Sequence, residues 1–193
     1  SAVFSKTFND REQGVGVYYQ DAQPQFQLGL FQKIDNGHRE TDLIGRLGWA
    51  DDSKLWTAGI SFYGEQIKDI DSSMNIWRVG ADLGVNLFGL MVTPEALIGK
   101  GEFADRNAKF GGYKVSLTYP IMCCGFKIQP IYRYDYFKKQ SNSITIDSYW
   151  RHTTGIAFFP SDYHRISAQV ETIHEYALNR YYSQFYLQYQ LKF

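Results

Sequence analysis

The histidines are the residues of this chain best suited to proton transfer. A histidine needs a nucleophile or a carboxylate beside it before it can act as a catalytic base. Glu171 and Glu175 flank His174, but no serine-containing motif of a known barrel enzyme surrounds that histidine. Catalysis therefore stays an alternative and is not the leading interpretation. The chain holds four histidines: His38, His152, His164 and His174.

The two cysteines, Cys123 and Cys124, are adjacent and precede Gly125. Adjacent cysteines rarely form a disulfide, because the bond strains the peptide between them. Their spacing matches no metal site, and no glycine-rich nucleotide loop follows a strand and opens a helix in this chain. We therefore expect two free or blocked thiols in a turn, and no metal ion or cofactor.

Isolated charges between apolar residues are the third chemically capable group. Basic side chains that line a water-filled passage lower the barrier for anions. Arg133 and Asp135 could instead neutralise each other. Arg78 and Asp82 could neutralise each other in the same way. The sequence favours neutralised pairs and free charges almost equally. The charges that we expect on one wet face are Lys33, Arg46, Arg78, Asp82, Lys114, Lys127, Arg133, Asp135, Arg151, Arg165, Glu171 and Lys192.

A pattern that repeats every two residues must position these charges. In the stretch around Arg78, apolar Trp77 and Val79 alternate with polar or small residues. A period of two is that of a β-strand, whose successive side chains point to opposite faces. A bend or bulge is expected where Gly99–Gly101 interrupts the pattern. The pattern predicts twelve strands, over residues 2–8, 14–20, 25–35, 41–50, 55–65, 75–87, 90–103, 110–121, 126–137, 148–159, 164–175 and 181–193.

The connectors between these segments are of two kinds that strictly alternate. One kind is short and turn-like, as at 88–89 and 160–163, and the other is mostly longer and more polar, as at 66–74 and 138–147. Up-and-down barrels of the bacterial outer membrane have short periplasmic turns and longer outer loops. The alternation predicts such a barrel, as one domain over 1–193, with both termini in the periplasm.

The composition is compatible with a membrane protein that crosses with strands. No run of 18 apolar residues is present, but a membrane strand needs only about 9–11 residues, with alternate ones apolar. The 33 aromatic residues, 15 Tyr, 14 Phe and 4 Trp, would overpack a soluble barrel, and many lie near strand ends, as interfacial girdles do. A soluble β-sandwich is the less favoured alternative. We expect apolar sides to face lipid and charged sides to face a lumen.

The last nine residues, FYLQYQLKF, carry large apolar or aromatic side chains at every second position. This pattern resembles the signal by which the outer-membrane assembly machinery recognises its clients. The residues that would form the signal are Phe185, Leu187, Tyr189, Leu191 and Phe193.

Three stretches resemble the bacterial phosphate-selective porin family (porins O and P), in its C-terminal part. They are NDREQGVGVYYQDAQPQFQLGLFQ, IYRYDYFKK, and TTGIAFFPSDYHRISAQVE with the closing QFYLQYQLKF. The resemblance implies a barrel of about sixteen strands, solutes such as phosphate, and homotrimers. This chain is about half the usual length, so we expect either a closed barrel of twelve strands, which we favour, or part of a larger barrel completed by other strands.

The leading functional prediction is a passive diffusion channel for small hydrophilic solutes, biased towards anions. The partners expected are outer-membrane lipid, the assembly machinery and these solutes. Basic and acidic residues number 20 each, so no net charge attracts nucleic acid. The alternatives are a structural or adhesive barrel with a plugged lumen and, less favoured, an enzyme in a barrel wall such as a phospholipase, acyltransferase or protease.

Overall fold

The described part of the chain is built from β-strands alone. The structure is a computed structural model that describes residues 13–19, 24–35, 38–51, 53, 55–68, 73–102, 105–142, 144–161 and 163–191. No helix able to span a membrane occurs among these residues. The strands are β1 (Gln13–Tyr19), β2 (Gln25–Asp35), β3 (His38–Ala50), β4 (Trp56–Lys68), β5 (Ser73–Leu87), β6 (Leu90–Glu102), β7 (Asp105–Thr118), β8 (Ile121–Cys123), β9 (Phe126–Ser141), β10 (Ile144–Ser161), β11 (His164–Glu175) and β12 (Arg180–Leu191).

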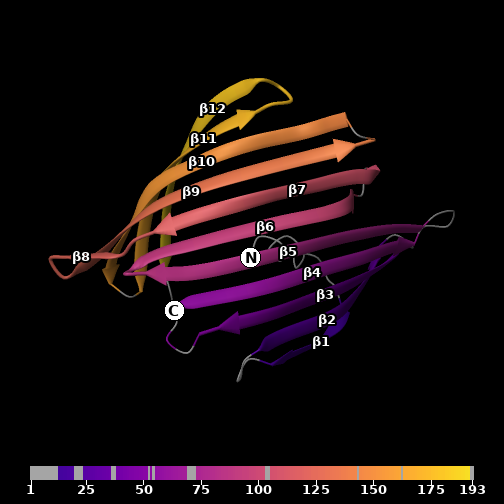
Figure 1. Cartoon of the computed structure of the whole chain (residues 1–193), viewed down its shortest axis with the longest axis horizontal. Helices are drawn as coiled ribbons and strands as arrows, with labels where there is room; N and C mark the ends of the chain where they lie inside the picture. Colours follow the sequence, from indigo (N-terminus) through magenta and orange to yellow (C-terminus); the bar gives the residue numbers. More distant parts are fainter. Residues whose placement is uncertain are drawn as a thin grey trace.

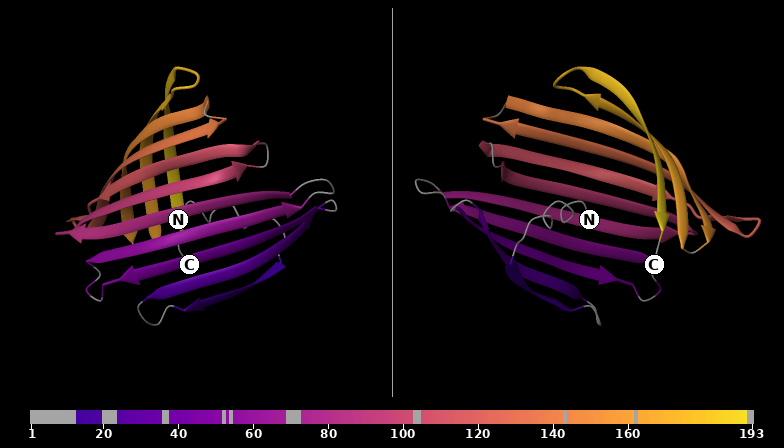
Figure 2. Two further views of the ribbon diagram at one scale, coloured as in Figure 1. Left: turned by 45° about the vertical axis from the view of Figure 1, so that its right-hand side comes forward. Right: turned by 180° about the vertical axis from the view of Figure 1, so that it is seen from behind.

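The strands form one antiparallel sheet of up-and-down order. Each strand pairs with its neighbour in the chain from β1 to β7, then β7 pairs with β9, and the order continues to β12. The sheet curls strongly, with no second layer of strands packed on it, and β1 and β12 lie at its two far ends (Figure 1; Figure 2). Within the described residues β1 and β12 do not pair, so this sheet has two open edges.

The structure has twelve strands in the expected up-and-down order, and they correspond to eleven of the expected strands, one of which is divided in two. The segments 25–35 and 164–175 are β2 and β11 with unchanged ends. The expected strand 110–121 is divided into β7 and the short β8 at Tyr119–Pro120, because proline has no N–H to donate to the ladder. The expected first strand, 2–8, lies outside the described residues.

The expected irregularity in the sixth strand of the sheet is also confirmed. The register between β6 and β7 shifts between Lys100 and Glu102. Gly101, at the shift, has a φ of +85°, and a Cβ there would lie 2.9 Å from the backbone oxygen of Asn75. Only glycine fits this position without strain.

The expected alternation of short and long connectors is wrong for the described hairpins. Strand β9 continues to Ser141 and β10 begins at Ile144, so most of the expected loop 138–147 belongs to the ladder. The hairpin between Glu102 and Asp105 is as tight as the one between Leu87 and Leu90. Polar residues do not interrupt strand pairing where both faces of a strand meet water. Loop lengths predicted from polar residues are therefore too long. The lengths of the connectors therefore do not indicate which ends of the strands are periplasmic.

The register separates the side chains into two faces of opposite character. Val170 of β11 pairs with Thr154 and Phe185 on one face, while its neighbour Glu171 pairs with Thr153 and Gln184 on the other. We call the face that includes Val170 the apolar face and the face that includes Glu171 the polar face. The apolar face carries most of the exposed large apolar side chains, among them Val17, Leu28, Leu43, Ile60, Val79, Ile98, Ile156, Val170 and Leu187.

The polar face is the concave side of the sheet. Thr153 and Ser167 are 1% and 2% exposed, although no second layer of strands covers them. Arg46 of β3 reaches Asp82 of β5 across the intervening strand, at 2.5 Å. Strands two apart in a sheet are separated by about 9.6 Å. Side chains therefore converge on this face, as they do inside a curl.

Aromatic side chains border the apolar face in rows. Consecutive register partners place Tyr113, Tyr136, Trp150, His174 and Tyr181 side by side on five strands. A second aromatic position, Phe158, lies eight residues from Trp150 on β10. Eight residues span about 26 Å along a strand, or about 20 Å across a bilayer at a tilt of about 40°. This spacing is close to the apolar band of membrane barrels, about 25 Å tall.

We predict that Val170→Lys destabilises the protein folded in lipid vesicles by about 2–4 kcal/mol. Val170 lies midway between the aromatic levels, where a lysine on the lipid side is most costly. The matched control is Gln169→Lys, one residue away on the polar face, which should change the free energy of unfolding by less than about 0.5 kcal/mol. Urea unfolding followed by tryptophan emission measures both. Equal effects of the two variants would contradict a lipid-facing apolar side.

Candidate functional site

A row of charged side chains crosses the polar face at one level. Asp82, Glu95, Lys114, Asp135 and Arg151 are successive register partners on β5, β6, β7, β9 and β10. Directly opposed residues in an antiparallel pair have their Cβ atoms about 4.5–5.5 Å apart. The register alone therefore brings five charges from five strands into contact range. With their ion-pair partners they form what we call the charge row: Arg46, Asp82, Glu95, Lys114, Arg133, Asp135, Arg151 and Glu171.

Arg46 forms a bidentate ion pair at one end of the charge row. Its Nη1 and Nη2 donate to the two carboxylate oxygens of Asp82, at 2.5 and 2.8 Å. To reach Asp82, the guanidinium of Arg46 passes over Gly59 of β4, where any Cβ would overlap it. Glycine at position 59 therefore permits the ion pair between β3 and β5.

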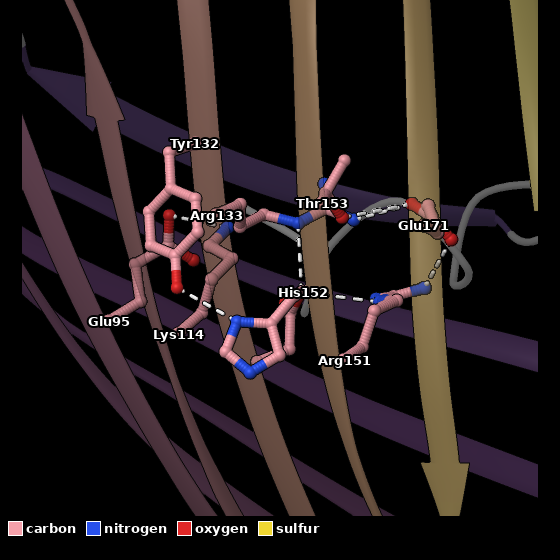
Figure 3. Close-up of polar contacts among 9 residues, drawn as sticks. Glu95, Lys114, Tyr132, Arg133, Arg151, His152, Thr153 and Glu171 are labelled. Atoms are coloured by element: carbon pink, nitrogen blue, oxygen red, sulfur yellow. Dashed lines mark hydrogen bonds and ion pairs between the residues drawn. The ribbon is translucent and has the colours of Figure 1, made fainter. Parts of the chain in front are cut away.

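A cluster of two arginines and two carboxylates forms the other half of the row (Figure 3). Arg133 donates through Nε to Asp135 at 2.9 Å and through Nη2 to Glu171 at 3.0 Å. Arg151 bonds the same two carboxylates, at 3.2 and 3.4 Å. The hydroxyl of Thr153, on β10, donates a hydrogen bond to Glu171 of β11 at 3.3 Å. The four charges form a closed ring across β9, β10 and β11.

The middle of the row is a single ion pair. Lys114 Nζ lies 2.8 Å from Glu95 Oε1, across β6 and β7. Side chains of the row line a depression on the polar face, together with Ser61 and Tyr149. This open depression is where a solute on the polar face would meet the charges.

The charge row is electrically balanced. It contains four basic and four acidic side chains, and each has an opposite partner within 3.4 Å. The side chains of Asp135 and Glu171 are only 12% and 9% exposed. Removing one partner of such a pair leaves a poorly hydrated charge, which costs more than the pair itself contributes. The row therefore holds strands together and presents little net charge.

The structure decides the two neighbour pairs that the sequence left open. Arg133 forms an ion pair with Asp135. Asp82 pairs with Arg46 and not with Arg78. Arg78 and Asp82 are four residues apart on one strand, or about 13 Å, which is beyond easy reach of an ion pair.

Three of the expected basic residues lie outside the charge row and contact aromatic rings. The Arg78 guanidinium is 5.2 Å from the centre of the Tyr63 ring. Lys127 Nζ lies 4.7 Å from the centre of the Phe159 ring, and the Arg165 guanidinium lies 5.8 Å from that same centre. Within the described residues none of these three cations has an ion pair. The side chain of Lys33, and the whole of Lys192, lie outside the described part of the structure.

The polar face also carries an apolar cluster that the sequence did not reveal. Ile44, Tyr63 and Ile76 are buried there at 4–6% exposure, with Phe31 packed against them. They lie on the same face as Arg78, because Tyr63 pairs with Arg78 and Ile44 in the register. Alternation in the sequence carries no information on which side chains the curl of the sheet brings together.

The histidines whose side chains are described do not assemble a catalytic arrangement. His152 Nδ1 and the Tyr132 hydroxyl are 2.8 Å apart, and His164 Nδ1 and the Tyr189 hydroxyl are 2.6 Å apart. His174 stacks on Tyr181, with ring centres 3.8 Å apart. His152 and His174 lie on the apolar face by register, in the aromatic rows. The side chain of His38 lies outside the description.

Comparison with solved structures is informative at the level of fold. The outer membrane channel DcaP of Acinetobacter baumannii superposes with a TM-score of 0.67 at 10% sequence identity, over 93% of this chain. The fold matches outer-membrane barrel structures. This chain spans 62% of the length of that channel. The β-domain of the Bordetella autotransporter BrkA covers 94% of this chain and 89% of its own length, with a TM-score of 0.48 at 14% identity.

No family model matches the chain, and no curated protein matches it by sequence. The resemblance to phosphate-selective porins therefore stays a prediction from the sequence.

We predict that Gly59→Ala lowers the free energy of unfolding by about 1–2 kcal/mol, because the added Cβ displaces the Arg46 guanidinium from Asp82. Gly48 is the matched control, since it pairs with Gly59 on the same face and a Cβ there would lie 3.7 Å from its nearest neighbour. Gly48→Ala should be close to neutral. Urea unfolding in detergent micelles measures both variants, and equal losses would argue against the Arg46 contact as the cause.

Proposed function

We propose that this chain forms the wall of a passive channel through the outer membrane for small hydrophilic solutes. The observation that carries the proposal is the separation of the two faces. The convex face is apolar and bordered by aromatic rows, as lipid contact requires, while the concave face holds the charges and the depression that they line. The fold likeness to an outer membrane channel supports the same conclusion.

The channel proposal requires the sheet to be closed. An open strand edge in hydrocarbon leaves backbone groups unpaired, at a cost of several kcal/mol each. The described sheet has open edges at β1 and β12. We infer that further strands join these edges, which favours the larger barrel over the closed twelve-strand form. That the chain spans 62% of the matched channel supports this inference.

The solute preference that we propose is a weak anion bias. The charge row is balanced, so it contributes little to selectivity. Arg78, Lys127 and Arg165 have no ion pair among the described residues, and we assign the bias to them. Asp42 and Glu65 lie outside the row on the same face, which keeps the bias weak. Phosphate-like solutes are what the sequence resemblance implies. Basic side chains in a narrow wet passage favour anions in general.

The setting of the protein is part of the same proposal. Phe185, Leu187, Tyr189 and Leu191 are exposed on β12 and alternate with polar residues. This row, completed by Phe193, fits recognition by the barrel-assembly machinery. We propose that the protein contacts outer-membrane lipid at this location. Homotrimers are what the sequence resemblance implies.

One observation favours a second candidate, a barrel of structural or adhesive function. Ile44, Tyr63, Ile76 and Phe31 pack together on the concave face, and ion pairs reach across strands beside them. Side chains that fill a lumen reduce conduction. A barrel plugged in this way would conduct poorly and would act through its surface.

We predict that the protein conducts ions in planar bilayers with a weak preference for anions. Glu171→Gln should raise the ratio of anion to cation permeability severalfold, because it leaves Arg133 and Arg151 with one carboxylate between them. Lys127→Gln combined with Arg165→Gln should lower the ratio. Zero-current potentials in a salt gradient measure both changes.

The control is Gln188→Asn on the polar face of β12, which leaves all charges in place. The absence of conductance would favour the plugged barrel. A cation preference, or no response to Glu171→Gln, would overturn the selectivity assigned to these residues.

A further inference from the structure

The hairpin of β8 and β9 carries two thiols at its tip. This hairpin projects beyond the neighbouring strands (Figure 1; Figure 2). Cys123 ends β8, Cys124 begins the turn, and both are free and exposed. Their sulfur atoms lie 3.7 Å apart. Such a pair is placed where a solute can reach both sulfurs together.

The backbone of the turn brings the two thiols to one side. Successive side chains in a strand point to opposite faces, so adjacent cysteines in a regular strand would point apart. Cys124 has a φ of +53° and Gly125 a φ of +83°. Positive φ at both central residues of a two-residue hairpin is the type I′ turn. The turn ends the alternation at Cys124 and lets its sulfur approach that of Cys123.

The turn itself does not require cysteine. The β5–β6 hairpin has the same geometry, with Phe88 at a φ of +52° and Gly89 at +91°. Leu87 and Phe88 occupy the positions of Cys123 and Cys124, since Leu87 pairs with Leu90 as Cys123 pairs with Phe126. Unrelated side chains form the same turn, so the paired thiols are a separate feature of this hairpin.

A disulfide is a poor product for this pair. The Cα atoms of adjacent residues joined by a trans peptide are about 3.8 Å apart, whereas disulfides join Cα atoms about 4.4–6.8 Å apart. Bonding Cys123 to Cys124 would strain the peptide between them. Two thiols that are held close but resist oxidation to each other remain available as ligands.

The sulfur separation matches the bite of a metal ion. Thiolates bind Zn²⁺ at about 2.3 Å in tetrahedral geometry, which sets two sulfurs about 3.8 Å apart. We propose that Cys123 and Cys124 form a chelating site for a thiophilic d¹⁰ metal ion such as Zn²⁺ or Cd²⁺. The ion replaces the two thiol protons, M²⁺ + 2 RSH giving M(SR)₂ + 2 H⁺. The described residues offer no group of three metal-binding side chains, so solvent completes the coordination.

The test uses the full chain folded in detergent, kept reduced and free of oxygen, and titrated with Cd²⁺. We expect one ion per chain, with a thiolate-to-cadmium charge-transfer band in the ultraviolet. Cys123→Ser and Cys124→Ser should each weaken binding roughly a hundredfold, because the second ligand no longer acts at high effective concentration. Cd²⁺, the softer ion, should displace Zn²⁺ from the intact pair.

The β5–β6 turn provides a gain-of-function control. Leu87→Cys with Phe88→Cys, made in a chain that carries both serine substitutions, should restore binding of one ion per chain. Folding of every variant is checked by heat-modified mobility in SDS gels. Single serine variants that bind as tightly as the parent chain would overturn the proposal. Two chains per ion, or failure of the transplanted pair in a folded protein, would also overturn it.

Discussion

In the proposed membrane setting, every backbone polar group must be paired within the sheet while one face of the sheet meets hydrocarbon, and this constraint accounts for the main features of the structure. It accounts for the continuous antiparallel ladder from β1 to β12 and for the apolar convex face. It also explains the aromatic rows near strand ends, because aromatic rings are favoured where hydrocarbon gives way to water. The same constraint is the reason we propose that further strands close the two open edges of the described sheet.

The charge row is the counterpart of that constraint on the wet side. Because polar side chains are excluded from the convex face, they collect on the concave one, where the curl forces them together. The crowded charges form ion pairs, among them the closed ring of Arg133, Asp135, Arg151 and Glu171. The row therefore links β3 to β5, β6 to β7 and β9 to β11 through ion pairs, and the proposed selectivity rests on the cations that lie outside it. Gly59 leaves the space that the Arg46 guanidinium occupies on its way to Asp82.

The fold was more predictable from the sequence than the site. The ends of β2 and β11 were predicted correctly, because the alternating segments are bounded there by turn-like or polar connectors. Alternation carries no information about neighbours across strands, so the partner of Asp82 was missed. Strand ends in β9 and β10 were missed for a related reason, since beyond the apolar band polar residues suit a strand as well as a loop. The sequence predicted two thiols in a turn, but it could not show that the geometry of this turn places their sulfurs 3.7 Å apart.

The orientation of the two faces is the central claim, and the four tryptophans test it directly. Register places Trp49, Trp56, Trp77 and Trp150 on the apolar face, two near each end of the strands. The account predicts that brominated lipids quench tryptophan emission from the folded protein in vesicles, most strongly when bromine is near the interface, and that aqueous iodide does not. Strong quenching by iodide with none by brominated lipid would contradict it.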